Sequence, residues 1–290
     1  MSILEINKAF RNIRYEDKNH LYFSTDGEHL ISVTQLINKL KDKFDSKYWS
    51  VNKAYTFSFY KTKQIWTGSG VYDNTSFYAD GVEISVDGTD HTHLSVTPET
   101  VLEQWRIDSL IGTSRGTYAH KLLENIESRK IEKPDKIIPY GIPTISAINY
   151  IKSLQVIDNL SERFVNEYSH LIPVAIECII GDVDLGIAGT FDRVYWNELS
   201  QSLEIWDFKT DKKMNFDNKY QKIKILNVDD CEYQKYSLQT SLYKYIVTKN
   251  TNLVLGDSYI ARLNIKEESL DIHKCIDYTK TIANIDWRKI

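Results

Sequence analysis

The sequence predicts an α/β protein, because two kinds of hydrophobic pattern alternate along it. Residues 144–168 carry apolar side chains at helical spacing, which is typical of a long amphipathic helix that packs on a core. Residues 171–180 and 187–196 are instead rich in β-branched and aromatic side chains, which favour strands. A second helix is expected over 231–249 and a last strand over 253–265. Strands and helices therefore follow one another along this half of the chain.

The composition is that of a folded, soluble protein. The chain has 290 residues, of which 42% are hydrophobic and 26% charged, and it is long enough to bury a sizeable core. A content of 19 Tyr and 6 Trp argues against a disordered chain. The net charge of −4 argues against a protein that coats nucleic acid, so any contact with nucleic acid must be confined to a local patch.

Cysteine and leader patterns narrow the class further. Cys178, Cys231 and Cys275 lie far apart and lack the spacing of a zinc or iron–sulfur site. We expect reduced thiols in a cytoplasmic protein of a bacterium or a phage-infected cell. No signal-peptide pattern and no apolar run of membrane-spanning length is seen, so neither export nor a membrane partner is expected.

The N-terminal part is predicted to hold a hairpin, two helices and an insertion. An Asp26-Gly27 turn between two extended runs indicates the hairpin over 19–31, and Ser32 or Thr34 is the expected cap of the helix that follows. Residues 64–97 shift to Gly, Asp, Ser, Thr and Tyr, which predicts a β-rich insertion. The expected domains are accordingly a mainly helical N-terminal region over 1–97 and a core over 98–290.

A helical stretch over 98–128 carries the first candidate ligand. Gly112 and Gly116 are expected to break it into two helices. His120 and Glu124 are four residues apart and so share one helix face, which is a geometry that can hold a metal. The alternative is a histidine whose partners are purely structural.

A predicted hairpin over 187–210 carries the other candidates. Asp207 and Lys209 are two residues apart on one strand and therefore share a face, while Asp192 lies on the partner strand. Two carboxylates and an ammonium in one patch favour a divalent metal, although a solvated strand face with an ion pair remains the alternative. Glu177, a lone acid in an apolar strand, lies either at an edge or beside that metal.

These motifs together resemble the RecB-like branch of the PD-(D/E)XK nuclease superfamily, which includes phage exonucleases and the mitochondrial genome maintenance exonuclease. The resemblance covers about half of the chain, from Gly116 to Ile265. The matching motifs are GTxxH at Gly116, Thr117 and His120, GxxD at Gly189 and Asp192, DxK at Asp207 and Lys209, and QxxxY at Gln239 and Tyr243.

The resemblance implies a restriction-endonuclease-like core, in which a central mixed β-sheet is flanked by helices. It also implies that His120, Asp192 and Asp207 bind one or two Mg²⁺ or Mn²⁺ ions, with Glu177 as a further candidate ligand, and that Lys209 orients or activates the attacking water. No iron–sulfur cluster is expected, because the cysteines do not match that version of the family. The residues expected to position the site or the substrate are Gln239, Tyr243, Glu124, Thr210, Lys212 and Lys213.

The function that follows from the resemblance is Mg²⁺- or Mn²⁺-dependent hydrolysis of DNA. We expect an exonuclease that acts on single strands or free ends, with any helicase or recombination partner on a separate polypeptide. The alternatives are a structure-specific or restriction-type endonuclease and a nucleic-acid-binding protein that keeps the fold without cleaving. Intact Asp192, Asp207 and Lys209 argue against the last of these.

Overall fold

The computed structural model describes most of the chain outside the expected insertion. The described residues are 6, 8–41, 44–53, 77–79, 82–84, 97–130, 132–210, 214–218, 221–223 and 225–289. Within the expected insertion, two short strands, β4 (Phe77–Ala79) and β5 (Val82–Ile84), pair antiparallel, and nearly all of its other residues lie outside the described part. Among the described helices, none combines the length and the apolar composition needed to cross a membrane.

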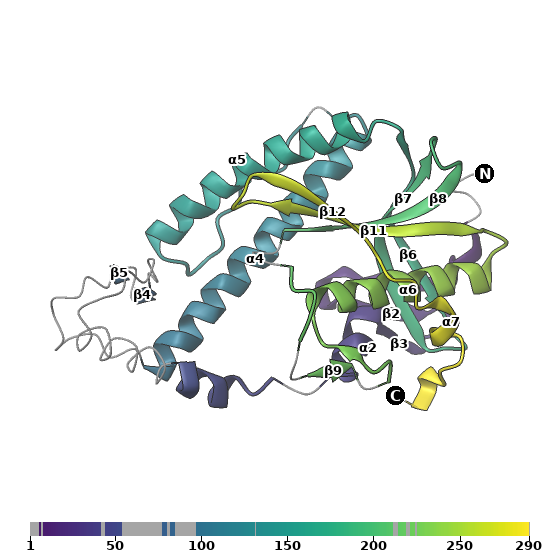
Figure 1. Cartoon of the computed structure of the whole chain (residues 1–290), viewed down its shortest axis with the longest axis horizontal. Helices are drawn as coiled ribbons and strands as arrows, with labels where there is room; N and C mark the ends of the chain where they lie inside the picture. The colour runs from purple at the N-terminus through teal and green to yellow at the C-terminus, as the bar shows by residue number, and fades with distance from the viewer. Residues whose placement is uncertain are drawn as a thin grey trace. The chain divides into compact units, whose positions relative to one another are not determined.

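An eight-stranded mixed sheet forms the centre of the fold (Figure 1). The strand order is β1-β2-β3-β7-β8-β11-β12, and β6 pairs with β7 as an additional strand. The β3–β7 and β8–β11 pairs are parallel and the other pairs are antiparallel, so the predicted mixed sheet is confirmed. The strand bounds are β1 Ile13–Glu16, β2 Leu21–Ser24, β3 His29–Ser32, β6 Leu171–Asp182, β7 Ile187–Asn197, β8 Ser202–Lys209, β11 Leu255–Asn264 and β12 Ser269–Lys274.

The N-terminal hairpin lies between the edge strand β1 and the central strand β7. Strands β2 and β3 pair antiparallel around the turn at Gly27, whose φ of +88° suits glycine, as predicted. Ser32 then caps helix α2 (Val33–Lys39) through a capping box with Gln35. Strand β3 joins the centre of the sheet by pairing Ile31 with Ile187 of β7.

The longer helices agree with the predicted ones except at one point. Helix α5 (Thr144–Glu167) and helix α6 (Glu232–Asn250) have the expected places. The expected break between Gly112 and Gly116 is wrong, because α4 (Pro98–Glu127) is one continuous helix. A glycine within a helix costs only about 1 kcal/mol relative to alanine, which the buried residues along the same helix can offset. The remaining short elements are the 3-10 turns η1 Asp17–Asn19 and η2 Trp287–Lys289, the strands β9 Lys222–Ile223 and β10 Val228–Asp229, and the helix α7 Thr279–Ile282.

Two compact units divide the chain. The first comprises Met1–Asp42, His120–Lys133 and Ile157–Ile290, and it contains the whole eight-stranded sheet. The second comprises Lys43–Ala119 and Pro134–Val156. The predicted domain boundary at residue 97 stays a prediction.

Two hydrophobic clusters pack helices against the central sheet. The larger cluster joins α2 and α6 to the sheet through residues such as Leu36 and Leu242. A second, aromatic cluster joins Leu123 of α4 and Phe164 of α5 to Phe208 of β8, with the Phe164 and Phe208 rings meeting edge to face. The strand that carries the DxK motif therefore has its position fixed by packing on both sides.

The C-terminal region is more ordered than the sequence predicts. The strand over 253–265 was expected to be the last one, and this is wrong, because a further strand, β12, pairs with β11 from Tyr259 to Asn264. Trp287 is buried and donates a hydrogen bond to the Ile282 carbonyl oxygen of α7. Only two of the six β12 side chains, Leu270 and Ile272, are apolar, so the local pattern did not indicate this strand and its pairing with β11 stabilises it.

Candidate metal and active site

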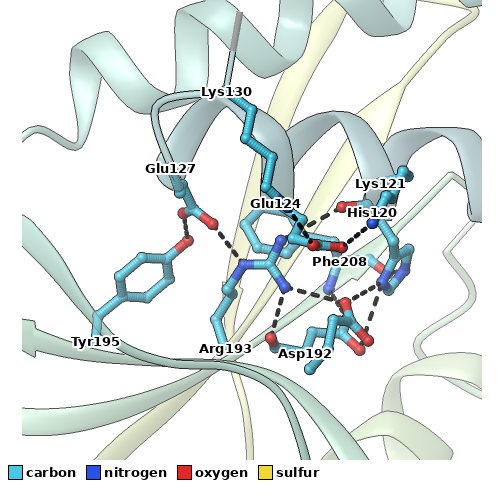
Figure 2. Close-up of polar contacts among 10 residues, drawn as sticks. His120, Lys121, Glu124, Glu127, Lys130, Asp192, Arg193, Tyr195 and Phe208 are labelled. Atoms are coloured by element: carbon cyan, nitrogen blue, oxygen red, sulfur yellow. Dashed lines mark hydrogen bonds and ion pairs between the residues drawn. The ribbon is translucent and has the colours of Figure 1, made fainter. Parts of the chain in front are cut away.

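Three ligand-type side chains from three elements converge in the first unit (Figure 2). His120 lies on α4, Glu177 on β6 and Asp192 on β7. His120 Nδ1 is 3.3 Å from Glu177 Oε1 and 3.6 Å from Asp192 Oδ1. One ligand atom from each residue lies within 4.8 Å of the others, a span that one cation can bridge.

Strand register explains why the two acids meet. Ile176 pairs with Arg193 and Cys178 with Phe191, so Glu177 lies opposite Asp192. Residues opposite one another in an antiparallel pair share a face of the sheet. The backbone of Glu177 has a φ of +46°, a left-handed conformation that costs roughly 1–3 kcal/mol in a residue other than glycine. Such strain is concentrated at functional sites.

Asp192 also joins β7 to β8 where their pairing stops. The β7–β8 ladder ends at Arg193 and Trp206, and the Phe208 backbone N–H donates to Asp192 Oδ2 at 2.8 Å instead of to a strand carbonyl. The other oxygen of the same carboxylate, Oδ1, faces His120. One side chain therefore fixes the end of the DxK strand and presents an oxygen to the cluster.

His120 is oriented by its second ring nitrogen. The Nε2 atom lies 3.2 Å from the Phe208 carbonyl oxygen, which favours a proton on Nε2 and leaves Nδ1 facing the two carboxylates. Burial lowers the pKa of His120, but the charges of Asp192 and Glu177 outweigh burial and raise this pKa to about 9. Without a metal the imidazole is thus a cation at neutral pH, which balances the two acids.

Asp207 and Lys209 form an ion pair beside this cluster. Lys209 Nζ lies 2.6 Å from Asp207 Oδ2, and the ammonium also lies 4.8 Å from the centre of the Tyr236 ring. Asp207 is 1% exposed, and among the described residues its Oδ1 atom has no hydrogen-bond partner. A buried carboxylate with one oxygen that accepts no hydrogen bond can be compensated by a bound cation.

The pKa values of this pair reflect its burial. Burial raises the pKa of Asp207 to about 6, helped by the charge of Asp192 and opposed by Lys209. Burial lowers the pKa of Lys209, but Asp207 and Asp192 outweigh burial and raise it. Lys209 therefore stays an ammonium, whose charge is available to the site.

A buried arginine lies behind the cluster, and the sequence reading missed it. Arg193 Nε contacts Glu127 Oε2 at 2.5 Å, and its Nη1 contacts Glu177 Oε1 at 3.0 Å. Tyr195 donates a hydrogen bond to the other oxygen of Glu127. The available signal was an arginine directly after the GxxD acid in a strand that is otherwise apolar, since a buried charge requires a partner.

Residues 100–278 match the sequence model of the PD-(D/E)XK nuclease superfamily, which is 179 of the 290 residues. The chain belongs to the PD-(D/E)XK nuclease superfamily. Membership implies a metal-dependent nuclease with a nucleic-acid substrate. A search of curated proteins found no match.

In this PD-(D/E)XK nuclease, Tyr243 of α6 lies against the GxxD strand, and Gln239 of the same helix contacts Tyr243. Gln239 Nε2 donates to the Tyr243 hydroxyl at 3.0 Å. A Cβ added at Gly189 would lie 2.7 Å from Tyr243 Cε1, so the glycine of the motif makes room for the tyrosine ring. Burial raises the pKa of Tyr243 well above its ordinary value, with the charges of Asp207 and Asp192 adding to the effect.

The other predicted positioning residues divide into two groups. Glu124 is not part of the cluster, because its carboxylate pairs with Lys121 at 2.8 Å and with Lys130 at 3.3 Å (Figure 2). Thr210 directly follows β8 and is half-buried. Lys212 and Lys213 lie outside the described residues. A role for these four residues in binding substrate stays a prediction.

Proposed function

We propose that this PD-(D/E)XK nuclease is a Mg²⁺- or Mn²⁺-dependent deoxyribonuclease of the RecB-like branch, and that it degrades DNA from ends or single strands. The observation that carries the proposal is the convergence of His120, Glu177 and Asp192 beside the buried ion pair of Asp207 and Lys209. The order of the four motifs supports the RecB-like branch.

The donor set fits a hard divalent cation. Carboxylate oxygens and a neutral imidazole are ligands for Mg²⁺ and Mn²⁺, and one or two ions would be held by His120, Glu177, Asp192 and Asp207. The site has two cations, Arg193 and Lys209, when His120 is neutral. It has four carboxylates, which belong to Glu127, Glu177, Asp192 and Asp207, so the net charge is −2. One divalent cation neutralises this excess.

The roles of the remaining groups follow from their charges and places. When bound, the metal polarises the phosphoryl group and stabilises negative charge on the attacking and leaving oxygens. The Lys209 ammonium would orient the attacking water and offset charge that develops on the phosphate. Gln239 and Tyr243 would hold the GxxD strand in place, and Glu124, Thr210, Lys212 and Lys213 would contribute to positioning the site or the DNA.

The proposed setting is cytoplasmic, in a bacterium or a phage-infected cell, with linear or single-stranded DNA as substrate. A separate helicase or recombination protein would supply any motor activity. The N-terminal region over 1–97 is proposed to precede a nuclease core over 98–290, as the position of the motifs favours.

A time course on three DNA forms tests the function. End-labelled linear single strands, linear duplexes and closed circles are incubated with Mg²⁺ and, in parallel, with EDTA. We expect Mg²⁺-dependent loss of label from linear forms and no cutting of closed circles. Cleavage of closed circles would favour the endonuclease alternative, and the absence of cleavage of all three forms with either Mg²⁺ or Mn²⁺ would favour a non-cleaving binding protein.

A further inference from the structure

The most buried charge in the first unit belongs to Arg193, and its contacts reach every element that carries the metal cluster. Its side chain is 0% exposed. Nη1 donates to Glu177 Oε1 at 3.0 Å and to the Asp192 carbonyl oxygen at 2.6 Å, while Nη2 donates to the His120 carbonyl oxygen at 3.4 Å. One planar group thereby connects β6, β7 and α4. Figure 2 shows Arg193 between Glu127 and Asp192.

The guanidinium is itself held from the opposite side. Glu127, one helical turn beyond Glu124 on α4, binds Arg193 Nε through Oε2 and accepts the Tyr195 hydroxyl through Oε1. The side chain of Glu127 is 5% exposed, so this ion pair is screened little by solvent. Each carboxylate oxygen has one partner, which fixes the rotation of the group.

Fold stability alone does not account for this arrangement. A buried ion pair is often no more stabilising than an apolar pair of similar volume, because both charges lose their hydration. Arg193 also donates one of its five N–H groups to Glu177. Glu177 has a strained backbone and lies opposite Asp192. An arginine fork can hold several acceptors at fixed angles, and lysine cannot.

We propose that Arg193 is a positioning residue for the metal cluster, and that Glu127 with Tyr195 fixes and neutralises it. This inference rests on the proposed metal-dependent function. Arg193 sets the place of the Glu177 carboxylate and of the backbones at Asp192 and His120. Glu127 supplies the negative charge that allows a guanidinium to lie this close to a cation site without repelling the ion.

The test measures Mn²⁺ affinity separately from folding. Glu127→Gln keeps the shape of the side chain and an oxygen for Tyr195, but it removes the charge that neutralises Arg193. Loss of a group that supports metal ligands typically weakens metal affinity by about 10–100-fold. We expect the Mn²⁺ dissociation constant of Glu127→Gln to increase by this factor. The electron paramagnetic resonance signal of free Mn²⁺ measures the dissociation constant. Arg193→Lys, which keeps the charge and loses the fork, should weaken binding to a similar extent.

The matched control is Asp182→Asn, at the C-terminal end of β6. Asp182 is also a buried carboxylate paired with a cation, Lys249, at 2.8 Å. Loss of the Asp182 charge should leave the Mn²⁺ dissociation constant within about twofold of wild type, because the Coulomb interaction weakens with distance. Circular dichroism and the melting temperature are recorded for every protein.

A second readout separates positioning from folding. In Glu127→Gln, raising the Mn²⁺ concentration should restore DNA cleavage toward the wild-type rate, whereas a partly unfolded protein would stay less active at all concentrations. If Arg193→Lys fails to fold, the Mn²⁺ affinity of Glu127→Gln decides the question. If Glu127→Gln also fails to fold, Tyr195→Phe, which removes only the hydroxyl, takes its place.

The outcomes distinguish this inference from the function on which it rests. Wild-type protein that binds Mn²⁺ and cleaves DNA, together with folded variants of unchanged Mn²⁺ affinity, would overturn the positioning role alone. Wild-type protein that binds no Mn²⁺ would overturn both proposals. Weakened Mn²⁺ binding in Glu127→Gln but not in Asp182→Asn would support the positioning role.

Discussion

Lys209 Nζ lies 2.6 Å from Asp207 Oδ2, and this ion pair is buried beside the His120–Glu177–Asp192 cluster. Asp207 Oδ1 has no hydrogen bond among the described residues, and the Lys209 ammonium compensates the carboxylate in the metal-free protein, with a smaller contribution from His120. We propose that, with a cation held by the neighbouring carboxylates, Lys209 would be available to the substrate phosphate.

Replacing Lys209 by Ala should reduce Mg²⁺-dependent DNA cleavage by about 10²- to 10³-fold, the usual effect of removing one group that stabilises transition-state charge. The fold should persist, because Asp207 can take up a proton once its counter-charge is gone. The rate constant for cleavage of linear DNA at saturating Mg²⁺ is the measurement.

Lys244→Ala is the control for that substitution. Lys244 also pairs with an aspartate, Asp277, at 2.6 Å, and both lysine side chains are 18% exposed. It lies on α6 with its partner outside the cluster, so cleavage should stay within about threefold of wild type, as for mutations away from a site. Equal losses in both variants would contradict a specific role for Lys209.

Metal affinity should rise with pH up to about 9. The pKa of His120 in the metal-free protein is raised to about 9, and only the neutral imidazole can bind a metal, so a bound ion must displace a proton below that pH. Calorimetry of Mn²⁺ binding at pH 7.5 in buffers of different ionisation enthalpy should show release of close to one proton. His120→Gln should bind more weakly and release far less, and equal release from both proteins would contradict the assignment.

The metal-free protein should lose stability as pH rises from about 6.5 to 9. His120 has a raised pKa in the fold, so its contribution is complete below the unfolded value near 6.5 and disappears as pH passes about 9. The pKa of Asp207 is also raised, to about 6, so this group likewise makes the protein less stable as pH rises, but at lower pH. Denaturant midpoints with EDTA should fall over this range in wild type and change less in His120→Asn.

Adding a methyl group at Gly189 should destabilise the fold. The new Cβ of Gly189→Ala would lie 2.7 Å from Tyr243 Cε1, and overpacking of this kind costs about 1–3 kcal/mol. Gly112→Ala is the control, because a Cβ there would meet no described atom within 4 Å beyond its own stretch of helix, and a helical alanine should stabilise by about 0.5–1 kcal/mol. Unfolding in urea measures both, and a neutral Gly189→Ala would show that the tyrosine ring moves freely.

Local patterns predicted much of the fold and the principal chemical groups. Alternation along one strand places Asp207 and Lys209 on the same face, and the structure shows their contact. The predicted hairpin corresponds to β7 and β8, and Ser32 caps α2 as one of two expected candidates. These features depend on residues a few positions apart, so a single sequence contains them.

Helix continuity and the C-terminal strand were predicted wrongly for a common reason. The glycines of α4 disfavour helix by a small amount, and the side chains of β12 favour strand only weakly. In both cases packing or pairing with distant segments outweighs the local preference. Glu124 shows the same limit, because sharing a helix face with His120 did not decide which of the two would turn toward the sheet.

The sequence by itself determined the set of reactive groups, their order, and the membership that they imply, since motif spacing is a covalent property of the chain. Tertiary structure decided which groups meet. Glu177 faces Asp192 through strand register, and Arg193 reaches Glu127 across 66 residues through the placement of α4 against the sheet. Register and helix placement result from the packing of the whole core, which no local pattern specifies.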